Sequence, residues 1–206
     1  PKGTEVRLTV KKVDGTINSV ILENGEIIPY TKAIVAPGID FKYDKGYIEG
    51  SEAYAPHAYK AGEQTVLLSE QLQNMKDGGT FVMVAPNNPF RCPPGPYERV
   101  SLVAHYLKHN KPNSKIIILD QKNKFSKQGL FQEGWEKLYK DMIDWRSVEF
   151  GGKVISVNPK TKVIKTDDGD VIADVLNYIP EQKAGKLAFD SGLVDGDWCP
   201  INTKTF

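Results

Sequence analysis

The sequence lacks the features that mark several large classes of protein. Its 27 basic and 26 acidic residues nearly cancel, which removes the general electrostatic argument for binding nucleic acid or a membrane surface. No apolar run approaches the roughly 18 residues that cross a bilayer, so no membrane span is predicted. The chain has two cysteines without a CxxC pair and three histidines, and we predict no metal site.

Glycine is scarce where a dinucleotide-binding protein would need it. Residues 79–86 form a short β-branched run typical of a buried strand, residues 97–109 have apolar side chains at helical spacing, and residues 115–120 form a second apolar run. This order predicts a βαβ unit. The turn after the first strand holds four prolines and one glycine, and proline offers no N–H to a phosphate. An ordinary NAD-binding domain is therefore disfavoured, and Asp120 is interpreted as a strand-end residue.

That turn carries one of the two cysteines. Cys92 is flanked by Arg91 and Arg99 and precedes the predicted helix, which favours a thiolate there. Cys199 lies far away in the sequence. The spacing alone leaves three alternatives open, namely two buried free thiols, a structural disulfide or a redox pair. His105 and His109 are spaced i, i+4 but are interpreted as a partly exposed surface pair.

A strand meander is present twice. The stretch 153–174 repeats the pattern of residues 10–31 at an offset of 144, which slips to 143 after the final turn. Val13 thereby matches Val157, and Val20 matches Ile164. Two copies predict two similar α/β domains, as in duplicated dinucleotide-binding flavoproteins.

The other elements are predicted from local patterns. Three strands are expected over residues 5–11, 19–23 and 26–35, with a turn at Asn24 and Gly25, and the segment 32–38 is expected to end as a buried strand. Residues 41–62 are expected to be loop plus a short helix. Helices are predicted over 63–75 and 129–144. The buried face of the second is predicted to comprise Leu130, Phe131, Trp135, Leu138 and Met142.

Five motifs together resemble one family. They are Arg-Cys-Pro-Pro-Gly-Pro-Tyr-Glu-Arg at 91–99, Trp-Cys-Pro-Ile-Asn-Thr-Lys-Thr-Phe at 198–206, Val-Ala-Pro-Gly-Ile-Asp-Phe at 35–41, Ala-Pro-His-Ala-Tyr-Lys-Ala-Gly-Glu-Gln at 55–64 and Ala-Gly-Lys-Leu-Ala at 184–188. With them the chain resembles the flavoprotein chain of flavocytochrome c sulfide dehydrogenase over nearly its whole length. The resemblance implies an α/β fold: a Rossmann-like βαβ domain without an NAD motif, with a three-stranded β-meander, plus part of a second, FAD-type domain.

The resemblance also implies a chemistry. Cys92 and Cys199 match the family's redox-active disulfide, and Glu98 matches the acidic residue near it. Pro37 and Gly38 match a loop of the FAD domain. Such enzymes oxidise sulfide at FAD and pass electrons to a cytochrome c subunit in the bacterial periplasm. Hydrosulfide would attack one sulfur of the disulfide, leaving a persulfide on it and a thiolate on the other cysteine.

The family's FAD-binding GxGxxG, its FAD-tethering cysteine and its C-terminal Gly-Asp segment have no match here, so the chain is expected to be a fragment that binds no FAD by itself. The implied domains are 1–75, a partial FAD-binding type; 76–182, a central NAD-like domain; and 183–206, a return segment with the second redox cysteine. The alternatives are a sulfide:quinone oxidoreductase-like flavoprotein and a non-catalytic α/β binding module with structural cysteines.

Overall fold

The computed structural model describes residues 7–205, and these form two compact units. Unit 1 comprises the described residues up to Phe41 together with those from Gln182 onward, and unit 2 is Lys42–Glu181. These two units are defined by how the chain packs. The predicted boundaries at 75 and 182 instead separate the FAD-type and NAD-like domains that the family resemblance implies. That predicted division stays a prediction.

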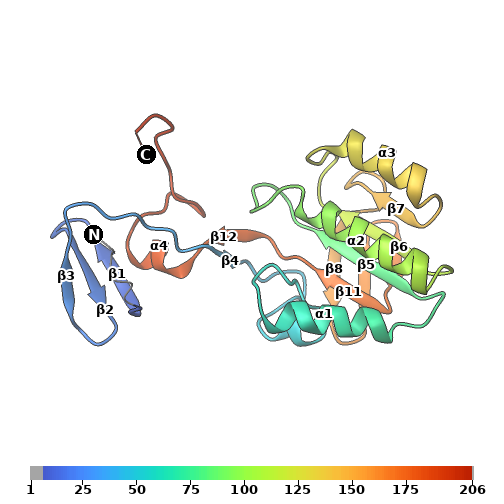
Figure 1. The fold of residues 1–206 in the computed structure, drawn as a ribbon, viewed down its shortest axis with the longest axis horizontal. Coiled ribbons are helices and arrows are strands. Elements are labelled where there is room, and N and C mark those ends of the chain that lie inside the picture. Colours follow the sequence, from blue (N-terminus) through green and yellow to red (C-terminus); the bar gives the residue numbers. More distant parts are fainter. Residues whose placement is uncertain (1–6, 206) are drawn as a thin grey trace. The chain divides into compact units, whose positions relative to one another are not determined.

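Unit 2 is built on a four-stranded sheet. Its strands are β5 (Thr80–Ala85), β6 (Lys115–Asp120), β7 (Ile143–Arg146) and β11 (Val175–Tyr178), in the order β11-β5-β6-β7 and all parallel (Figure 1). Strands β5 and β6 follow the two predicted apolar runs, and α2 (Gly95–Asn110) connects them. The predicted α/β class and its βαβ unit are therefore confirmed.

A meander and helices pack against this sheet. The meander consists of β8 (Val154–Asn158), β9 (Val163–Thr166) and β10 (Gly169–Ile172), and its apolar side chains share a buried cluster with Val82 and Val84 of β5. Side chains alternate along a strand, so Phe81 and Met83 point to the opposite face. Both are fully buried, and α2 contacts β5.

Two further predicted helices are confirmed in position. Helix α1 (Glu63–Asn74) matches the prediction over 63–75, and a single 3-10 turn, η1 (Ser51–Ala53), is the short helix expected within residues 41–62.

The helix predicted over 129–144 is too long. Helix α3 (Gln128–Leu138) ends six residues earlier, and β7 follows it and pairs with β6. The chain leaves the helical conformation at Tyr139, which has a φ of −134°, and Ile143 then pairs with Ile116 in the sheet. Parallel pairing overrides the helical pattern here. Of the predicted buried face, Trp135 and Met142 are buried, but Leu130 and Leu138 are 69% and 50% exposed.

Unit 1 contains the first copy of the meander, formed by β1 (Val10–Asp14), β2 (Ser19–Leu22) and β3 (Ile27–Pro29). Part of the strand predicted over 5–11 lies outside the described residues. The two copies pair in the same register: Val13 faces Val20 as Val157 faces Ile164, and both first strands have an irregularity at equivalent places. The internal repeat is therefore present in the structure.

The segment after the first meander differs from its prediction. Residues 32–38 form no strand, and Ile34 is 98% exposed. In the second copy the corresponding segment is β11, which pairs with β5 and is buried throughout. The prediction of a buried strand at 32–38 is wrong because, among the described residues, no strand pairs with this segment.

Two connecting segments complete the fold. In unit 1, β4 (Ile39–Phe41) pairs antiparallel with β12 (Gln182–Ala184), and the short helix α4 (Lys186–Asp190) follows β12. In unit 2, the N–H of Lys42 donates to the carbonyl of Glu181 at 2.8 Å. The first and last residues of unit 2 therefore meet.

Candidate functional site around Cys92

Cys92 lies in a tight turn that leads directly into α2. The helix begins at Gly95, two residues earlier than predicted, and the N–H of Gly95 donates to the carbonyl of Cys92 at 2.8 Å. Cys92 has a φ of 57°, an uncommon conformation for a residue with a Cβ. Its side chain is exposed, which removes the alternative of a buried thiol.

Tyr59 covers one side of this turn. Its hydroxyl lies 3.4 Å from the carbonyl oxygen of Cys92, a long hydrogen bond, and its main-chain carbonyl accepts a hydrogen bond from the guanidinium of Arg91. A Cβ added to Gly95 would lie 2.8 Å from the Tyr59 hydroxyl and 3.2 Å from Cys92 Sγ. Only glycine fits this contact between the tyrosine and the cysteine turn.

Arg99 points back from α2 onto the loop before Tyr59. One of its terminal nitrogens, Nη1, donates to the carbonyl of His57 at 2.9 Å and to Asn177 Oδ1 at 3.0 Å, and Nη2 donates to the carbonyl of Ala58 at 2.6 Å. Its guanidinium carbon lies 5.4 Å from the centre of the Tyr59 ring, a cation–π distance. Both flanking arginines are thus engaged by the loop.

These residues line a shallow hollow of about 330 Å³. Glu98, in the first turn of α2, lines it together with Cys92 and is exposed. The structure therefore brings two of the three predicted catalytic residues, Cys92 and Glu98, to one hollow. The remaining lining residues are Ala58, Tyr59, Arg91, Gly95, Arg99 and Leu102.

Burial sets the protonation states of the supporting residues. Burial, together with the nearby charges of Lys60 and Arg99, lowers the pKa of His57 to about 4. It also raises the pKa of the Tyr59 phenol above its ordinary value, so the hydroxyl stays protonated. Burial lowers the pKa of Arg99 from its usual value, with the Tyr59 phenol opposing that shift. His57 and Tyr59 are therefore both uncharged beside Cys92, and the charged groups next to them include Lys60, Arg91 and Arg99.

Cys199, the third predicted catalytic residue, lies in unit 1. Cys199 is exposed and follows Trp198, whose carbonyl accepts from the N–H of Asp195 at 2.9 Å. Because Cys92 belongs to unit 2 and Cys199 to unit 1, their pairing stays a prediction.

The loop at Pro37 and Gly38 lies against the start of α4. Gly185 donates its N–H to the carbonyl of Gly38 at 3.0 Å, and a Cβ on Gly185 would lie 2.5 Å from the carbonyl oxygen of Pro37. This loop offers open space at Gly38, but the described residues of unit 1 include no glycine-rich turn between a parallel strand and a helix. They do not fit the pyrophosphate of FAD.

The place where an NAD-binding domain holds a ribose is filled by protein. Asp120, fully buried, accepts hydrogen bonds from Tyr97 Oη at 2.6 Å, Lys122 Nζ at 2.7 Å and Trp145 Nε1 at 3.0 Å. Phe125 stacks on Tyr97 with ring centres 3.7 Å apart. Asp120 is indeed a strand-end residue, with its carboxylate committed inside the protein, and Tyr97 is a core residue.

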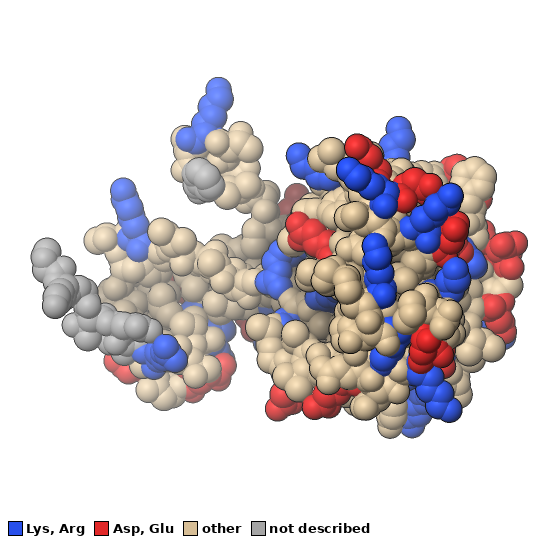
Figure 2. Space-filling view, turned by 45° about the vertical axis from the view of Figure 1, so that its right-hand side comes forward, with Lys and Arg blue, Asp and Glu red and all other residues tan. Residues whose placement is uncertain are grey.

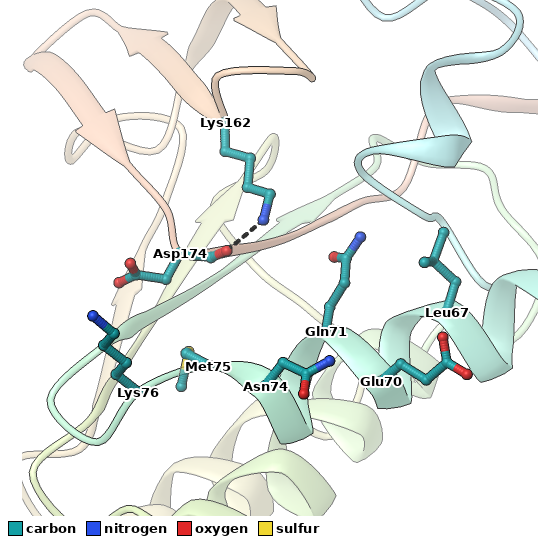
Figure 3. Close-up of a pocket in the computed structure, with 8 residues that line it drawn as sticks. All are labelled: Leu67, Glu70, Gln71, Asn74, Met75, Lys76, Lys162 and Asp174. Atoms are coloured by element: carbon teal, nitrogen blue, oxygen red, sulfur yellow. Dashed lines mark hydrogen bonds between the residues drawn. The ribbon is translucent and has the colours of Figure 1, made fainter.

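A second hollow, of about 460 Å³, lies between α1 and the base of the second meander (Figure 3). Gln71 points into it from α1, opposite Lys162, whose Nζ donates to the carbonyl of Asp174 at 2.6 Å (Figure 3). Gln71 Nε2 donates to the carbonyl of Tyr54, while its Oε1 is buried and accepts no hydrogen bond from the described part of the chain. Neither cysteine lines this hollow.

The charged surface residues and the remaining histidines of the described chain form no further candidate site. Lysines, arginines and acidic residues are interspersed over the face of unit 2 in Figure 2. His105 and His109 are both exposed, with ring centres 4.4 Å apart, as expected for a surface pair. Within residues 7–205, no three His, Cys, Asp or Glu side chains gather to hold a metal, and no helix is long and apolar enough to cross a membrane.

Sequence reasoning missed the support for the cysteine turn. The contacts of Tyr59, Asn177 and Arg99 have no periodic signal, because their partners are distant in sequence and most of them are main-chain carbonyls. The one available signal was the 55–64 motif, which contains Tyr59 without indicating its contact.

Three known structures have a fold similar to that of the chain. The chain superposes with a TM-score of 0.62 on the sulfide:quinone oxidoreductase of Aquifex aeolicus, at 18% identity over 93% of this chain and 46% of that one. It matches a chain of the covalent putidaredoxin reductase–putidaredoxin complex with a TM-score of 0.62, at 16% identity over 92% of this chain and 44% of that one. A chain of the Tetrahymena thermophila mitochondrial ATP synthase matches with a TM-score of 0.55, at 16% identity and coverages of 95% and 51%.

These likenesses show the fold, and the chain spans about half the length of the structures it matches. Family membership has separate support from the sequence. Residues 65–180, more than half of the chain, match the family described as sulfide dehydrogenase [flavocytochrome c] flavoprotein chain, central. That match includes the turn of Cys92, the helix α2 and the residues that fill the ribose position. The chain belongs to the family of flavoprotein chains of flavocytochrome c sulfide dehydrogenase.

Proposed function

We propose that this chain is part of a flavoprotein that oxidises sulfide through a redox-active disulfide between Cys92 and Cys199. The observation that carries the proposal is the exposed thiol of Cys92, in a left-handed turn at the start of α2, within the family match. Once it is part of a disulfide, a sulfur at that exposed place is open to attack by a small nucleophile, and the arginines beside it attract an anion such as hydrosulfide.

The sulfur step needs only the disulfide as oxidant. Hydrosulfide attacks the sulfur of one cysteine, a new S–S bond forms, and the bond between Cys92 and Cys199 breaks. The products are a persulfide on one cysteine and a thiolate on the other, so atoms and charge balance. Glu98, which shares the hollow with Cys92, is proposed to hold or move the proton of the incoming sulfide.

The rest of the pathway belongs to the full-length protein. FAD is the proposed cofactor there. A cytochrome c subunit is the proposed next acceptor, and the bacterial periplasm the proposed location. We expect the present chain alone to bind no FAD tightly and to turn over no sulfide, since the described residues of unit 1 include no glycine-rich turn between a parallel strand and a helix.

Non-reducing peptide mapping tests the disulfide. We expect one linked peptide pair containing Cys92 and Cys199. After anaerobic sulfide, we expect one of the two peptides to carry one extra sulfur atom. Cys92→Ser and Cys199→Ser, each carrying a single thiol, are the controls. Thiols that never link and take up no sulfur would overturn the proposal and favour a non-catalytic module.

The Aquifex aeolicus relative raises a second candidate, a quinone-reducing enzyme. The two candidates share the sulfur step and differ in the electron acceptor. Reduction of a cytochrome c against reduction of a soluble quinone by the full-length protein separates them.

A further inference from the structure

The turn of Cys92 is held from outside by a single loop. Residues 56–59 are buried, although they have no helical or strand structure. Ala58 in this loop has a φ of 49°, which costs free energy for a residue with a Cβ and persists only where the surroundings enforce it. The contacts that enforce it reach the loop from three directions.

The first two directions are α1 and the sheet. Gln64, at the start of α1, accepts the N–H groups of His57 and Ala58 on its Oε1, at 3.0 and 3.1 Å. Asn177, fully buried in β11, donates from Nδ2 to the carbonyls of Pro56 at 2.6 Å and His57 at 3.1 Å. The loop is therefore tied to a helix and to a strand of the central sheet.

The third direction is α2 itself, through Arg99. This side chain satisfies the carbonyls of His57 and Ala58 and binds Asn177, so it joins the helix that follows Cys92 to the loop and to β11. Its planar fork is suited to several fixed acceptors at once, which a lysine ammonium cannot reproduce. Beyond the fork the loop continues into Tyr59, whose ring lies under the guanidinium.

We propose that Arg99 is a positioning residue for the Cys92 thiol and acts through Tyr59. Arg99 fixes the 56–59 loop, the loop fixes Tyr59, and the Tyr59 hydroxyl fixes the turn between Cys92 and Gly95. The catalytic importance of this positioning rests on the proposed function. The positioning itself can be tested on the reduced thiol alone. Arg99 itself donates all three of its hydrogen bonds described above to the loop and to Asn177, so it acts on sulfur indirectly.

The test is the rate at which iodoacetamide alkylates Cys92 relative to Cys199 in the same reduced chain. Cys199 lies in the other unit and serves as the internal control. In Arg99→Lys we expect Cys92 to react about threefold faster because the turn loosens, and in Tyr59→Phe about twofold faster, as for the loss of one weak hydrogen bond. The double variant should exceed Arg99→Lys by little, since both changes break one chain of contacts.

Two matched variants separate positioning from general destabilisation. Arg146→Lys changes an arginine of unit 2 that pairs with Asp144 instead, and Tyr54→Phe changes an exposed tyrosine; both should leave the ratio of the two rates unchanged. An unchanged ratio in Tyr59→Phe, which keeps the ring and its packing, would overturn the proposal even if Arg99→Lys does not fold. Additive effects in the double variant would also overturn it. Because no sulfide or flavin is present, failure of the sulfide proposal leaves this result intact.

Discussion

The two meanders share a local structure and differ in what they cover. Both have the same strand pairing, yet the second buries Ile164 completely against a four-stranded sheet, whereas its counterpart Val20 in the first is only half-buried. The first meander instead contacts the five-residue helix α4, and Ser191 accepts the N–H of Val13 at 2.9 Å. Strand pairing thus follows from the repeated sequence, and burial follows from the neighbouring elements.

The difference in burial is largest in the segments that follow the two meanders. Residue Leu176 in β11 is fully buried, while Ile34, after the first meander, is 98% exposed. We expect Leu176→Ala to lower the free energy of unfolding of unit 2 by about 2–5 kcal/mol, since it leaves a cavity in the core. Ile34→Ala should change that of unit 1 by less than about 0.5 kcal/mol. Urea denaturation followed by hydrogen exchange in each unit measures both, and equal losses would refute the contrast.

Acid should also destabilise the two units to different extents. Burial lowers the pKa of His57 in unit 2 to about 4, whereas an unfolded histidine titrates near about 6.5. The neutral ring therefore stabilises unit 2 fully above about pH 6.5, and about 2–3 kcal/mol of stability is lost as the pH falls from there to about 4. Unit 1 has no histidine and should show no loss in this window.

Unit-resolved hydrogen exchange at pH 7, 5.5 and 4.5 checks this. His57→Gln should flatten the profile of unit 2, whereas the same change at the exposed His105 should leave it as it was. A profile that stays steep in His57→Gln would assign the acid loss to other groups.

The turn glycines should behave alike in both copies. Gly25 and Gly169 occupy equivalent turns with φ values of 86° and 114°, and a Cβ at either would meet open space. Alanine should therefore cost about 1 kcal/mol at each, through backbone conformation alone. Matched thermal unfolding of Gly25→Ala and Gly169→Ala tests this, and a large cost at only one glycine would show that the copies differ in their turns as well.

The smallest expected effect lies in the first turn of each meander. Hydrogen bonds from Thr16 and then Lys12 lower the pKa of Asp14 to about 2, and the equivalent residue in the second copy is Asn158, which accepts the N–H groups of Lys160 and Thr161. The lowered pKa means that the Asp14 carboxylate stabilises its turn above about pH 4, and that this is lost as the pH falls toward 2. Asp14→Asn should remove this dependence.

An NMR titration of the Asp14 carboxyl measures that shift directly. The reciprocal change, Asn158→Asp, should introduce a similar acid dependence into the second copy. If the carboxyl of Asp14 titrates at its ordinary pKa, the two turns differ in sequence but not in their response to acid.

The sequence predicts what depends on nearby residues. The α/β class, both strands of the βαβ unit, α1, α2 and the repeat all come from spacing or from turn glycines such as Gly25, and the structure has them. It could not predict β7, because Ile143 becomes a strand only by pairing with Ile116. Nor could it predict that residues 32–38 stay exposed, since the apolar pattern there is the same as in a segment that has a partner.

The candidate site divides in the same way. Cys92 and Glu98 were identified from one contiguous motif, and the structure places both at one hollow. Tyr59 and Asn177 were not, because each acts through main-chain atoms of residues that sequence spacing does not relate to it. The roles of Cys199, Pro37 and Gly38 stay predictions.

The hydrogen bond between Lys42 and Glu181 brings the two ends of unit 2 together, as in a domain inserted into another. A polypeptide whose two ends meet can be inserted between two paired strands of a host at the entropic cost of closing a short turn, whatever its own length. Unit 2 therefore has the chain organisation of an inserted domain, and the paired strands β4 and β12 directly precede and follow it in the sequence. We expect it to fold when excised at 42 and 181, carrying the Cys92 turn and its whole supporting loop with it.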